Sequence, residues 1–239
     1  MIEEQQRLKE LEGWHIQEEL NFDKRLIRFR YETIQPKLVG SRGLELGPAA
    51  GSMTKFLVND FEELTIVEGS KSLLNEIPDY PNIQKVHSLF EKFKPRGVYD
   101  SIIMEHILEH VENPVELLKL AKSWLSPKGR LFAGVPNGNS IHRLAGVKMG
   151  LLSHQCELGD RDQSLGHRRV YTKETFTADL LESGVEIFEF GGVYFKPVST
   201  PQIQDYWTEE MITGFFELGK DFPELAAEIY CICGQTKEE

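Results

Sequence analysis

The nine residues from Ser164 to Thr172, SLGHRRVYT, form the densest group of potentially reactive side chains in this chain. His167 could act as a general base, because the imidazole group titrates near neutral pH. Arg168 and Arg169 could each bind a carboxylate or phosphate through paired hydrogen bonds. The stretch therefore predicts a site for an anionic or hydroxylated small molecule, with His167 as a candidate catalytic residue.

A second group, MEHILEHV, places Glu105, His106, Glu109 and His110 directly after an apolar run. Two histidines four residues apart on a helix can chelate zinc, but zinc proteases carry them in the order H-E-x-x-H. Here Glu109 precedes His110 instead. The run therefore predicts no metal site, and a local hydrogen-bonding role for His110.

A third group is the glycine turn in GLELGPAAGSMTKFL, where Gly47 and Gly51 are four residues apart. A dinucleotide-binding turn would have two glycines separated by one residue, and a P-loop would contain Gly-Lys-Ser/Thr, so neither motif is present. The turn can still bring backbone N–H groups close to a ligand. Glu68, 23 residues after Glu45, ends the next apolar run, where its carboxylate could accept hydrogen bonds from both hydroxyls of a ribose.

The elements that position these groups alternate between strand and helix patterns. Five strands are predicted at Gly43–Leu46, Leu64–Glu68, Ile83–His87, Tyr99–Glu105 and Arg130–Val135, and two more within residues 186–197 and 228–235. Strands that alternate with helices form parallel sheets with right-handed crossovers. We therefore predict a single α/β domain over residues 1–239, with a doubly wound seven-stranded sheet whose final strand is antiparallel.

The motifs LELGPAAG, IVEGS, VHSLFEKF and YDSIIMEHILEHVENP, in this order, resemble the class I S-adenosylmethionine-dependent methyltransferases over about residues 43–136. The resemblance implies a Rossmann-like fold and S-adenosylmethionine as cofactor. It also implies that residues 1–40, including a helix that ends near Gly40, cover the cofactor.

The resemblance also implies roles for individual residues. The turn would pass beneath the methionine part of the cofactor, Glu68 would hold the ribose, and the residues after the third strand would flank the adenine, with Glu91 or backbone groups replacing an aspartate common in relatives. Glu105 and the second catalytic candidate, His106, would lie near the methyl-transfer point, and Arg28 or Tyr31 could contact the cofactor carboxylate. The full set of predicted cofactor-binding residues is Arg28, Glu45, Gly47, Pro48, Ala49, Gly51, Glu68, Gly69, Ser88, Leu89, Phe90 and Glu105.

The segment 136–171 has no strand pattern of its own, which is typical of a functional lid or of inserted helices. Residues 138–172 carry a net charge of +2 within a chain of net charge −11, so the lid could hold an anionic acceptor. The predicted substrate-binding residues are Asn137, Arg143, Arg168, Arg169 and Tyr171. Thr172 is expected to cap the following helix, with an incomplete capping box.

Composition limits the remaining choices. The chain has 239 residues and an acidic balance, which argues against a broad nucleic-acid interface. No apolar run is long enough to span a membrane, the N-terminus is unlike a secretory signal, and three cysteines cannot all pair, so a cytoplasmic protein is expected. We predict a small-molecule methyltransferase, with O-methylation favoured. N-methylation and a non-catalytic cofactor-binding role remain open as alternatives, and a homodimer is possible.

Overall fold

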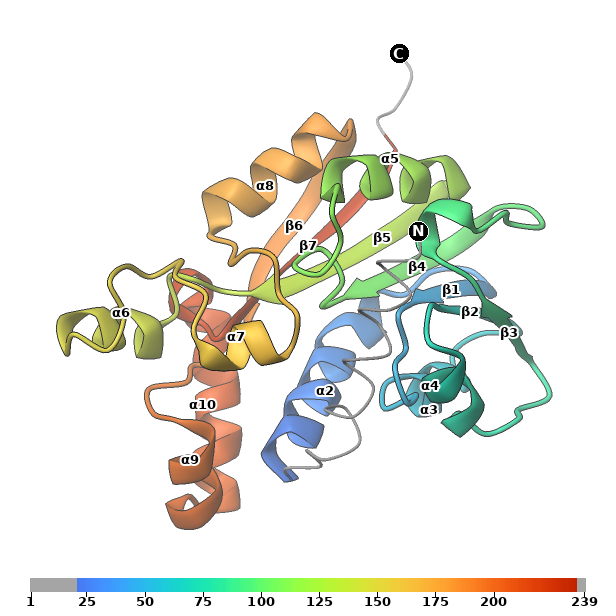
Figure 1. Ribbon diagram of the computed structural model, residues 1–239. Coiled ribbons are helices and arrows are strands. Elements are labelled where there is room, and N and C mark those ends of the chain that lie inside the picture. Colours follow the sequence, from blue (N-terminus) through green and yellow to red (C-terminus); the bar gives the residue numbers. More distant parts are fainter. Residues whose placement is uncertain (1–20, 236–239) are drawn as a thin grey trace.

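The computed structural model describes residues 21–235 and contains one seven-stranded sheet (Figure 1). The order of the strands across the sheet is β3-β2-β1-β4-β5-β7-β6. Only β7 runs antiparallel to its neighbours, β5 and β6. The strands are β1 Arg42–Leu46, β2 Glu63–Glu68, β3 Ile83–His87, β4 Tyr99–Glu105, β5 Leu125–Pro136, β6 Val185–Val193 and β7 Glu228–Gln235. The predicted fold class is confirmed.

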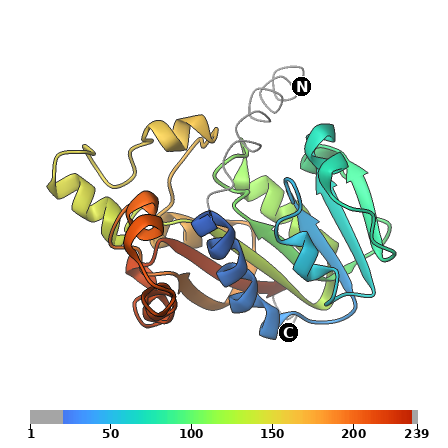
Figure 2. The ribbon, with the colours of Figure 1, turned by 90° about the horizontal axis from the view of Figure 1, so that it is seen from below.

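Helices cover both faces of this sheet. Those of the described residues are α2 Asn21–Ile34, α3 Thr54–Leu57, α4 Lys71–Glu76, α5 Pro114–Trp124, α6 Ile141–Lys148, α7 Asp160–Ser164, α8 Lys173–Glu182, α9 Thr200–Tyr206 and α10 Glu209–Asp221, with 3-10 turns η1 Gln35–Lys37, η2 Phe90–Lys92 and η3 Pro223–Leu225. One core lies between the sheet and helices α5 and α8. The other lies between the sheet and helices α2, α3, α4, α9 and α10, of which α2 lies beside α9 and α10 (Figures 1 and 2).

Helix α5 shows how the sequence specifies one of these layers. Pro114 occupies the first turn, where a missing N–H costs nothing and the fixed φ suits a helix. Leu117, Leu118, Ala121 and Trp124 recur at helical spacing and are buried. This apolar stripe packs against the sheet, and together with Leu180 and Phe176 of α8 it closes one face.

The segment after β5 leaves the carboxyl edge of the sheet and forms α6 and α7, at the left of Figure 1. We call residues 138–171 the lid. An isolated parallel bridge joins Asn137, the residue just before the lid, to Tyr171, its last residue. The amide of Gly138 also donates to the Tyr171 carbonyl. The lid therefore begins and ends at one point of the sheet edge, as a single insertion.

Two details differ from the sequence predictions, and a third lies outside the described residues. The leading helix ends at Ile34 rather than near Gly40, because Pro36 has no N–H to continue the helical hydrogen bonds; the chain continues as η1 from Gln35. The capping box of α8, expected to be incomplete, is complete: the Thr175 hydroxyl accepts from the Thr172 amide, the place that Glu usually fills. Residues 1–20 of the predicted N-terminal cover lie outside the described residues.

The connection between β3 and β4 contains η2 as its helical element, so part of the sheet face at β2 and β3 stays uncovered. A surface groove of about 490 Å³ lies there, and Thr65, Val86 and Phe93 are among its lining residues. Its remaining lining includes four Lys or Arg side chains, Lys85, Lys92, Lys94 and Arg96, and no Asp or Glu. This positive hollow thus lies away from the lid.

Candidate functional site

Three carboxylates lie at or near the carboxyl ends of adjacent parallel strands. Glu45 is the fourth residue of β1, Glu68 ends β2 and Glu105 ends β4. Glu45 pairs with Ile103 of β4 and Ile66 of β2 in the sheet register. In an open α/β sheet this edge is where ligands bind. The three sequence-predicted acids are therefore brought to one edge.

The glycine turn folds back onto Glu68. The amide of Ala49 donates to Glu68 Oε2 at 3.1 Å, and the amide of Ser70 donates to Oε1 at 2.8 Å. Burial raises the pKa of Glu68, although these backbone hydrogen bonds oppose the shift. A carboxylate has about four acceptor positions. About two therefore remain for a ligand, on a side chain whose orientation is already fixed.

Gly47 has a φ of +63°, a conformation that favours glycine. A Cβ at this position would lie 2.2 Å from Ile107 Cδ1 and 3.4 Å from the Phe90 ring. The turn is thus packed between the residues after β4 and those after β3. A larger residue than glycine would push these segments apart.

Ser88 and Leu89 connect β3 to η2, which begins at Phe90. The Ser88 amide donates to the Glu68 carbonyl at 3.1 Å, while the Ser88 hydroxyl donates to the Leu89 carbonyl at 2.8 Å. Glu91, which could have replaced the aspartate of relatives, is exposed. We therefore expect backbone groups of this connection, rather than Glu91, to contact the adenine.

Glu45 lies deeper in the sheet and accepts a hydrogen bond from the Thr54 hydroxyl at 2.6 Å. Burial raises its pKa to about 7 despite this hydrogen bond, and the charge of Glu68 adds to the shift. The side chain is only 4% exposed, and its hydrogen bond with Thr54 joins β1 to the start of α3, directly after the glycine turn. Direct contact with a ligand would need the turn to open.

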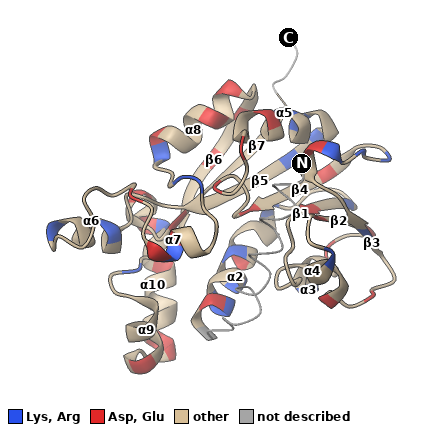
Figure 3. Ribbon diagram, in the orientation of Figure 1, with Lys and Arg blue, Asp and Glu red and all other residues tan. Residues whose placement is uncertain are grey.

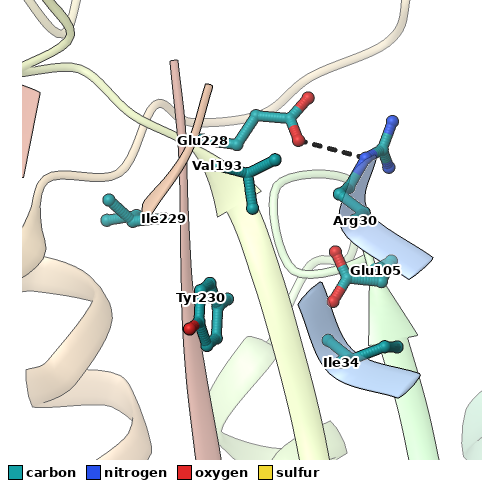
Figure 4. A pocket seen from close by; sticks show the side chains of 7 residues that line it. All are labelled: Arg30, Ile34, Glu105, Val193, Glu228, Ile229 and Tyr230. Atoms are coloured by element: carbon teal, nitrogen blue, oxygen red, sulfur yellow. Dashed lines mark ion pairs between the residues drawn. The ribbon is translucent and has the colours of Figure 1, made fainter. Parts of the chain in front are cut away.

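A buried charged cluster lies beside Glu105 (Figure 4). Arg30 Nε lies 3.0 Å from Glu228 Oε2, and the two side chains are 14% and 10% exposed. His106 Nε2 lies 3.3 Å from Glu228 Oε1, and His106 Nδ1 lies 3.2 Å from Glu109 Oε1. Burial and Arg30 oppose protonation of His106, but the two carboxylates outweigh them and raise its pKa to about 9.

The residue His106 also has a strained backbone, with a φ of +56°. Its amide donates to the Gly134 carbonyl at 2.9 Å, which holds the turn against β5. A Cβ at Gly134 would lie 2.1 Å from Glu105 Oε2, so glycine provides the space for that carboxylate. Glu105 Oε1 has no hydrogen-bond partner within residues 21–235, and burial raises the Glu105 pKa although Arg30 opposes the shift.

A narrow cleft lies at this cluster, and it has no room for a water molecule in this structure. It is lined by Arg30, Ile34, Glu105, Val193, Glu228, Ile229 and Tyr230, which come from α2, β4, β6 and β7 (Figure 4). Sequence reasoning did not find Arg30 or Glu228. One signal was available: Arg30 follows the buried Leu26 by four residues, so both face the sheet.

The same periodicity corrects the prediction for Arg28. Its side chain is 66% exposed and pairs with Glu32 one turn later. Arg28 therefore lies on the outer side of α2, away from the carboxyl edge of the sheet. Tyr31, the other candidate on this helix, donates its hydroxyl to Asp60 Oδ2 at 3.0 Å.

Most of the predicted substrate-binding residues are engaged within the protein. Asn137 donates to the carbonyls of Glu224 and Ala226, and the buried Tyr171 donates its hydroxyl to Asp179 Oδ2 at 2.8 Å. These two side chains therefore hold the ends of the lid, and their substrate-binding role stays a prediction.

The lid arginines behave in the same way. Arg143 donates to the carbonyls of Gln155 and Glu157 and to Asp162 Oδ2. Arg169 donates to the carbonyls of Leu108, Val111 and Glu112. The positive charge predicted for the lid is thus partly used to hold it together; in Figure 3, α7 carries both signs of charge. Arg168 is exposed, with its Nε donating to the His110 carbonyl, and stays a candidate.

His167 is held at the end of the lid, next to the turn after β4. Its Nδ1 lies 3.1 Å from Asp162 Oδ1, and its side chain is 6% exposed. Its ring packs edge-on against His110, with 4.8 Å between the ring centroids. The two catalytic candidates, His106 and His167, are thus both near Glu109, on opposite sides of one turn.

The sequence of this chain is similar to those of known methyltransferases. A family model described as a methyltransferase domain matches residues 14–189. The chain is 30% identical over 111 residues to the malonyl-[acyl-carrier protein] O-methyltransferase of Halalkalibacterium halodurans, covering 42% of this chain and 41% of that protein. It is 22% identical over 183 residues to the ubiquinone biosynthesis O-methyltransferase of Xanthomonas euvesicatoria, covering 72% and 73%. The first match spans less than half of the relative's length.

Structural comparison supports the fold. The N-methyltransferase NodS from Bradyrhizobium japonicum, solved in complex with S-adenosyl-L-homocysteine, matches 96% of this chain and 96% of its own with a TM-score of 0.59 and 15% identity. Within residues 21–235 no helix has the length and apolar character needed to cross a membrane.

Proposed function

The chain belongs to the methyltransferase-domain family, and we propose that it transfers the methyl group of S-adenosylmethionine to an oxygen of a small molecule. The family match covers 14–189, and the curated relatives that match are O-methyltransferases by name. The observation that carries the proposal is the contact of the glycine turn with Glu68, because it joins the two cofactor motifs at the carboxyl edge of the sheet.

In the cofactor half of the site, Glu68 would accept the ribose hydroxyls through the two acceptor positions that backbone amides leave open. The turn from Gly47 to Gly51 would lie beneath the methionine part. Phe90 would pack against the base, since it already lies against the turn at Gly47. Arg30, rather than Arg28, is the arginine of α2 that faces this edge of the sheet.

The sulfonium supplies an already activated methyl group, so the protein's task is to align the acceptor and exclude water. The buried turn after β4 and the lid provide an enclosed wall for this purpose. A hydroxyl acceptor needs a base, and His167 is the better candidate: its Nδ1 faces Asp162, so Nε2 is left to accept a proton. His106 lies between two carboxylates that keep it protonated and that its two ring nitrogens face, so it is the weaker candidate for a base.

An amine acceptor is the alternative, and one observation favours it. Glu105 Oε1 is buried and has no hydrogen-bond partner within the described residues. Together with Glu228 and Glu109, it gives this edge an excess of carboxylates that a cationic amine would complement. Mass spectrometry of products from matched hydroxyl and amine acceptors would decide between the two, because the methylated atom differs.

The central test is cofactor binding by calorimetry with S-adenosylmethionine. Glu68→Ala should weaken binding by about 1–3 kcal/mol, since charge-assisted hydrogen bonds to the ribose are lost. Glu63→Ala is the matched control, because Glu63 lies at the other end of β2 and its side chain is 71% exposed. Equal affinities of the two variants would contradict the ribose role. A folded wild-type protein that does not bind the cofactor would overturn the proposed function.

A further inference from the structure

Glu109, His110 and His167 bring three metal-binding side chains together at the edge of the proposed site. One ligand atom of each residue lies within 4.8 Å of the others. Glu109 and His110 come from the turn after β4, and His167 comes from the end of the lid, 57 positions later. This sequence distance explains why the run EHILEH alone predicted no metal site.

The Glu109 side chain is completely buried, with 0% exposed. Neither of its carboxylate oxygens accepts a well-formed hydrogen bond within the described residues. Its nearest polar neighbour is His106, whose Nδ1 lies 3.2 Å from Oε1. The ion pair with His106 compensates Oε1 in part. Oε2 has no hydrogen-bond partner within the described residues, which is costly for a buried carboxylate, and a bound cation would offset this cost.

His167 is oriented as metal-binding histidines usually are. Its Nδ1 faces the carboxylate of Asp162 at 3.1 Å, which leaves Nε2 as the ligand atom. Asp162 is in turn held by Arg143, whose Nη1 lies 3.1 Å from Asp162 Oδ2. A carboxylate behind the imidazole fixes the tautomer and the ring orientation and increases the basicity of the ligand nitrogen.

Backbone contacts hold the two parts of the cluster together. The amide of Arg168 donates to the Glu109 carbonyl at 2.8 Å, and Arg169 NH1 donates to the carbonyls of Leu108 and Val111, each at 2.6 Å. These hydrogen bonds flank the proposed ligands on both segments. The cluster is therefore assembled by the fold before any ion binds.

We propose that Glu109, His110 and His167 form a binding site for one divalent transition-metal ion. Two imidazoles and one carboxylate suit Zn²⁺, Mn²⁺, Fe²⁺ or Co²⁺, whereas Mg²⁺ and Ca²⁺ prefer all-oxygen sites. Three protein ligands leave at least one position open to an exogenous oxygen. The consequence for the acceptor rests on the proposed function: an acceptor with an oxygen anion or hydroxyl could bind the ion beside the methyl-transfer point. With Nε2 of His167 bound to the ion, the ion would replace His167 as the group that assists loss of the hydroxyl proton.

The test uses tag-free, full-length protein treated with a chelator and kept without S-adenosylmethionine. Titration with Zn²⁺ in a calorimeter, and metal analysis after dialysis, should give one bound ion per chain. His110→Asn and His167→Asn should each weaken binding at least about 10-fold. His154→Asn is the matched control, since His154 is an exposed lid histidine outside the cluster, and it should bind like the wild type.

Glu109→Gln should weaken binding similarly, but this buried variant could fail to fold, so the two histidine variants carry the decision after circular dichroism confirms their fold. Titration with Co²⁺ adds a spectroscopic measurement: the visible absorption bands of protein-bound Co²⁺ should disappear in His167→Asn and persist in the control. Mg²⁺ should bind more weakly than Zn²⁺.

The proposal would be wrong if the wild type bound no stoichiometric ion, or if both histidine variants bound Zn²⁺ as tightly as the control does. A parallel titration with S-adenosylmethionine on the same samples separates the two ideas. A wild type that does not bind S-adenosylmethionine would reject the proposed function, whereas a wild type that binds S-adenosylmethionine but no stoichiometric metal ion would reject the metal site alone.

Discussion

Four carboxylates of the site, Glu68, Glu105, Glu109 and Glu228, have different surroundings, and these suggest a division of roles. Glu68 accepts two backbone amides, so its orientation is fixed before a ligand arrives. Glu228 is paired with Arg30 and His106, whereas Glu105 and Glu109 keep oxygens without hydrogen bonds within residues 21–235. We infer that Glu68 and Glu228 organise the edge of the sheet. Glu105 and Glu109 are the two carboxylates that a bound cationic group would stabilise most.

His142 of α6 gives a prediction for the pH dependence of stability. Burial, with the positive charges of Lys196 and Arg143, lowers its pKa to about 4. Its ordinary value is about 6.5, so between pH 6.5 and 4 the unfolded chain binds more protons than the folded one. The contribution of His142 to the free energy of unfolding is therefore present above pH 6.5 and lost as the pH falls to 4, by up to about 3 kcal/mol.

Urea unfolding of the wild type and His142→Asn at pH 7.5, 6, 5 and 4 would measure this. The difference between the two proteins should change steeply across the acidic range. The exposed His154→Asn should instead run parallel to the wild type. A constant difference for His142→Asn would show that this ring is protonated as easily in the folded state as in the unfolded one.

The cofactor half of the site could be predicted from sequence because its signals are local. Gly47 needs a special φ, and Glu68 ends an apolar run, so each residue is recognised within its own segment. The acceptor half depends on long-range contacts instead. Asp162 and Glu109 decide what His167 faces, and Glu228 reaches His106 from the last strand. Residue types alone do not show which arginine is already paired, so the internal contacts of Arg143 could not be predicted from the sequence.

The lid is an element whose position depends on a few polar contacts with the turn after β4. Arg169 provides the largest set, since its guanidinium donates to three carbonyls of that turn. Arginine is suited to this because its planar group presents several donors in a fixed arrangement. The lid end that carries His167 is thereby held against Glu109 and His110.

Arg169→Gln should lower the free energy of unfolding by about 2–3 kcal/mol, because carbonyls of the turn lose their donors without access to full solvation. Arg161→Gln is the control: Arg161 is 48% exposed and pairs with Asp23 at the surface, so its loss should cost under about 1 kcal/mol. Urea denaturation of both variants gives the comparison. Similar losses for the two would mean that the Arg169 contacts do not hold the lid.

Helix and strand positions were predicted better than their ends. The bounds of β3, β4 and β7 follow from the apolar pattern, but β5 begins at Leu125, five residues before the prediction, because Ser126 to Gly129 continue in extended form beside Tyr99. The residues after β6 form two helices, α9 and α10, which are divided at Trp207 and Thr208, since the Thr208 hydroxyl accepts from the Met211 amide and caps α10. Capping by a single side chain thus sets a boundary that periodicity does not reveal.

Across the whole molecule, one sheet separates two cores, and both must form for the site to exist. The turn after β4 belongs to the core with α5 and α8, whereas Arg30 belongs to α2 on the other side. The antiparallel β7 contributes to both cores, through Cys231 and Cys233 on one face and Tyr230 and Ile232 on the other. The chain should therefore unfold as one cooperative unit, as a single domain would.

Phe29 tests this expectation, because it joins the first described helix to the last. Its ring stacks on Phe216 of α10 with 4.2 Å between the centroids, and it lies 5.8 Å from the ring of Tyr194. Phe29→Ala should lower the free energy of unfolding by about 3–5 kcal/mol, since it leaves a cavity between α2 and α10. Phe188→Ala, at a side chain that is 53% exposed on β6, should cost much less.

Tryptophan fluorescence can follow each core separately. Trp124 lies in the core with α5, and Trp207 packs against the core with α2. Of the three tryptophans, a variant that keeps only Trp124 and a variant that keeps only Trp207 would therefore report on opposite faces of the sheet. If the molecule is one domain, both signals shift to lower urea concentration together in Phe29→Ala. If only the Trp207 signal shifted, the α2–α10 side would unfold on its own, and the site would be built across two units rather than within one.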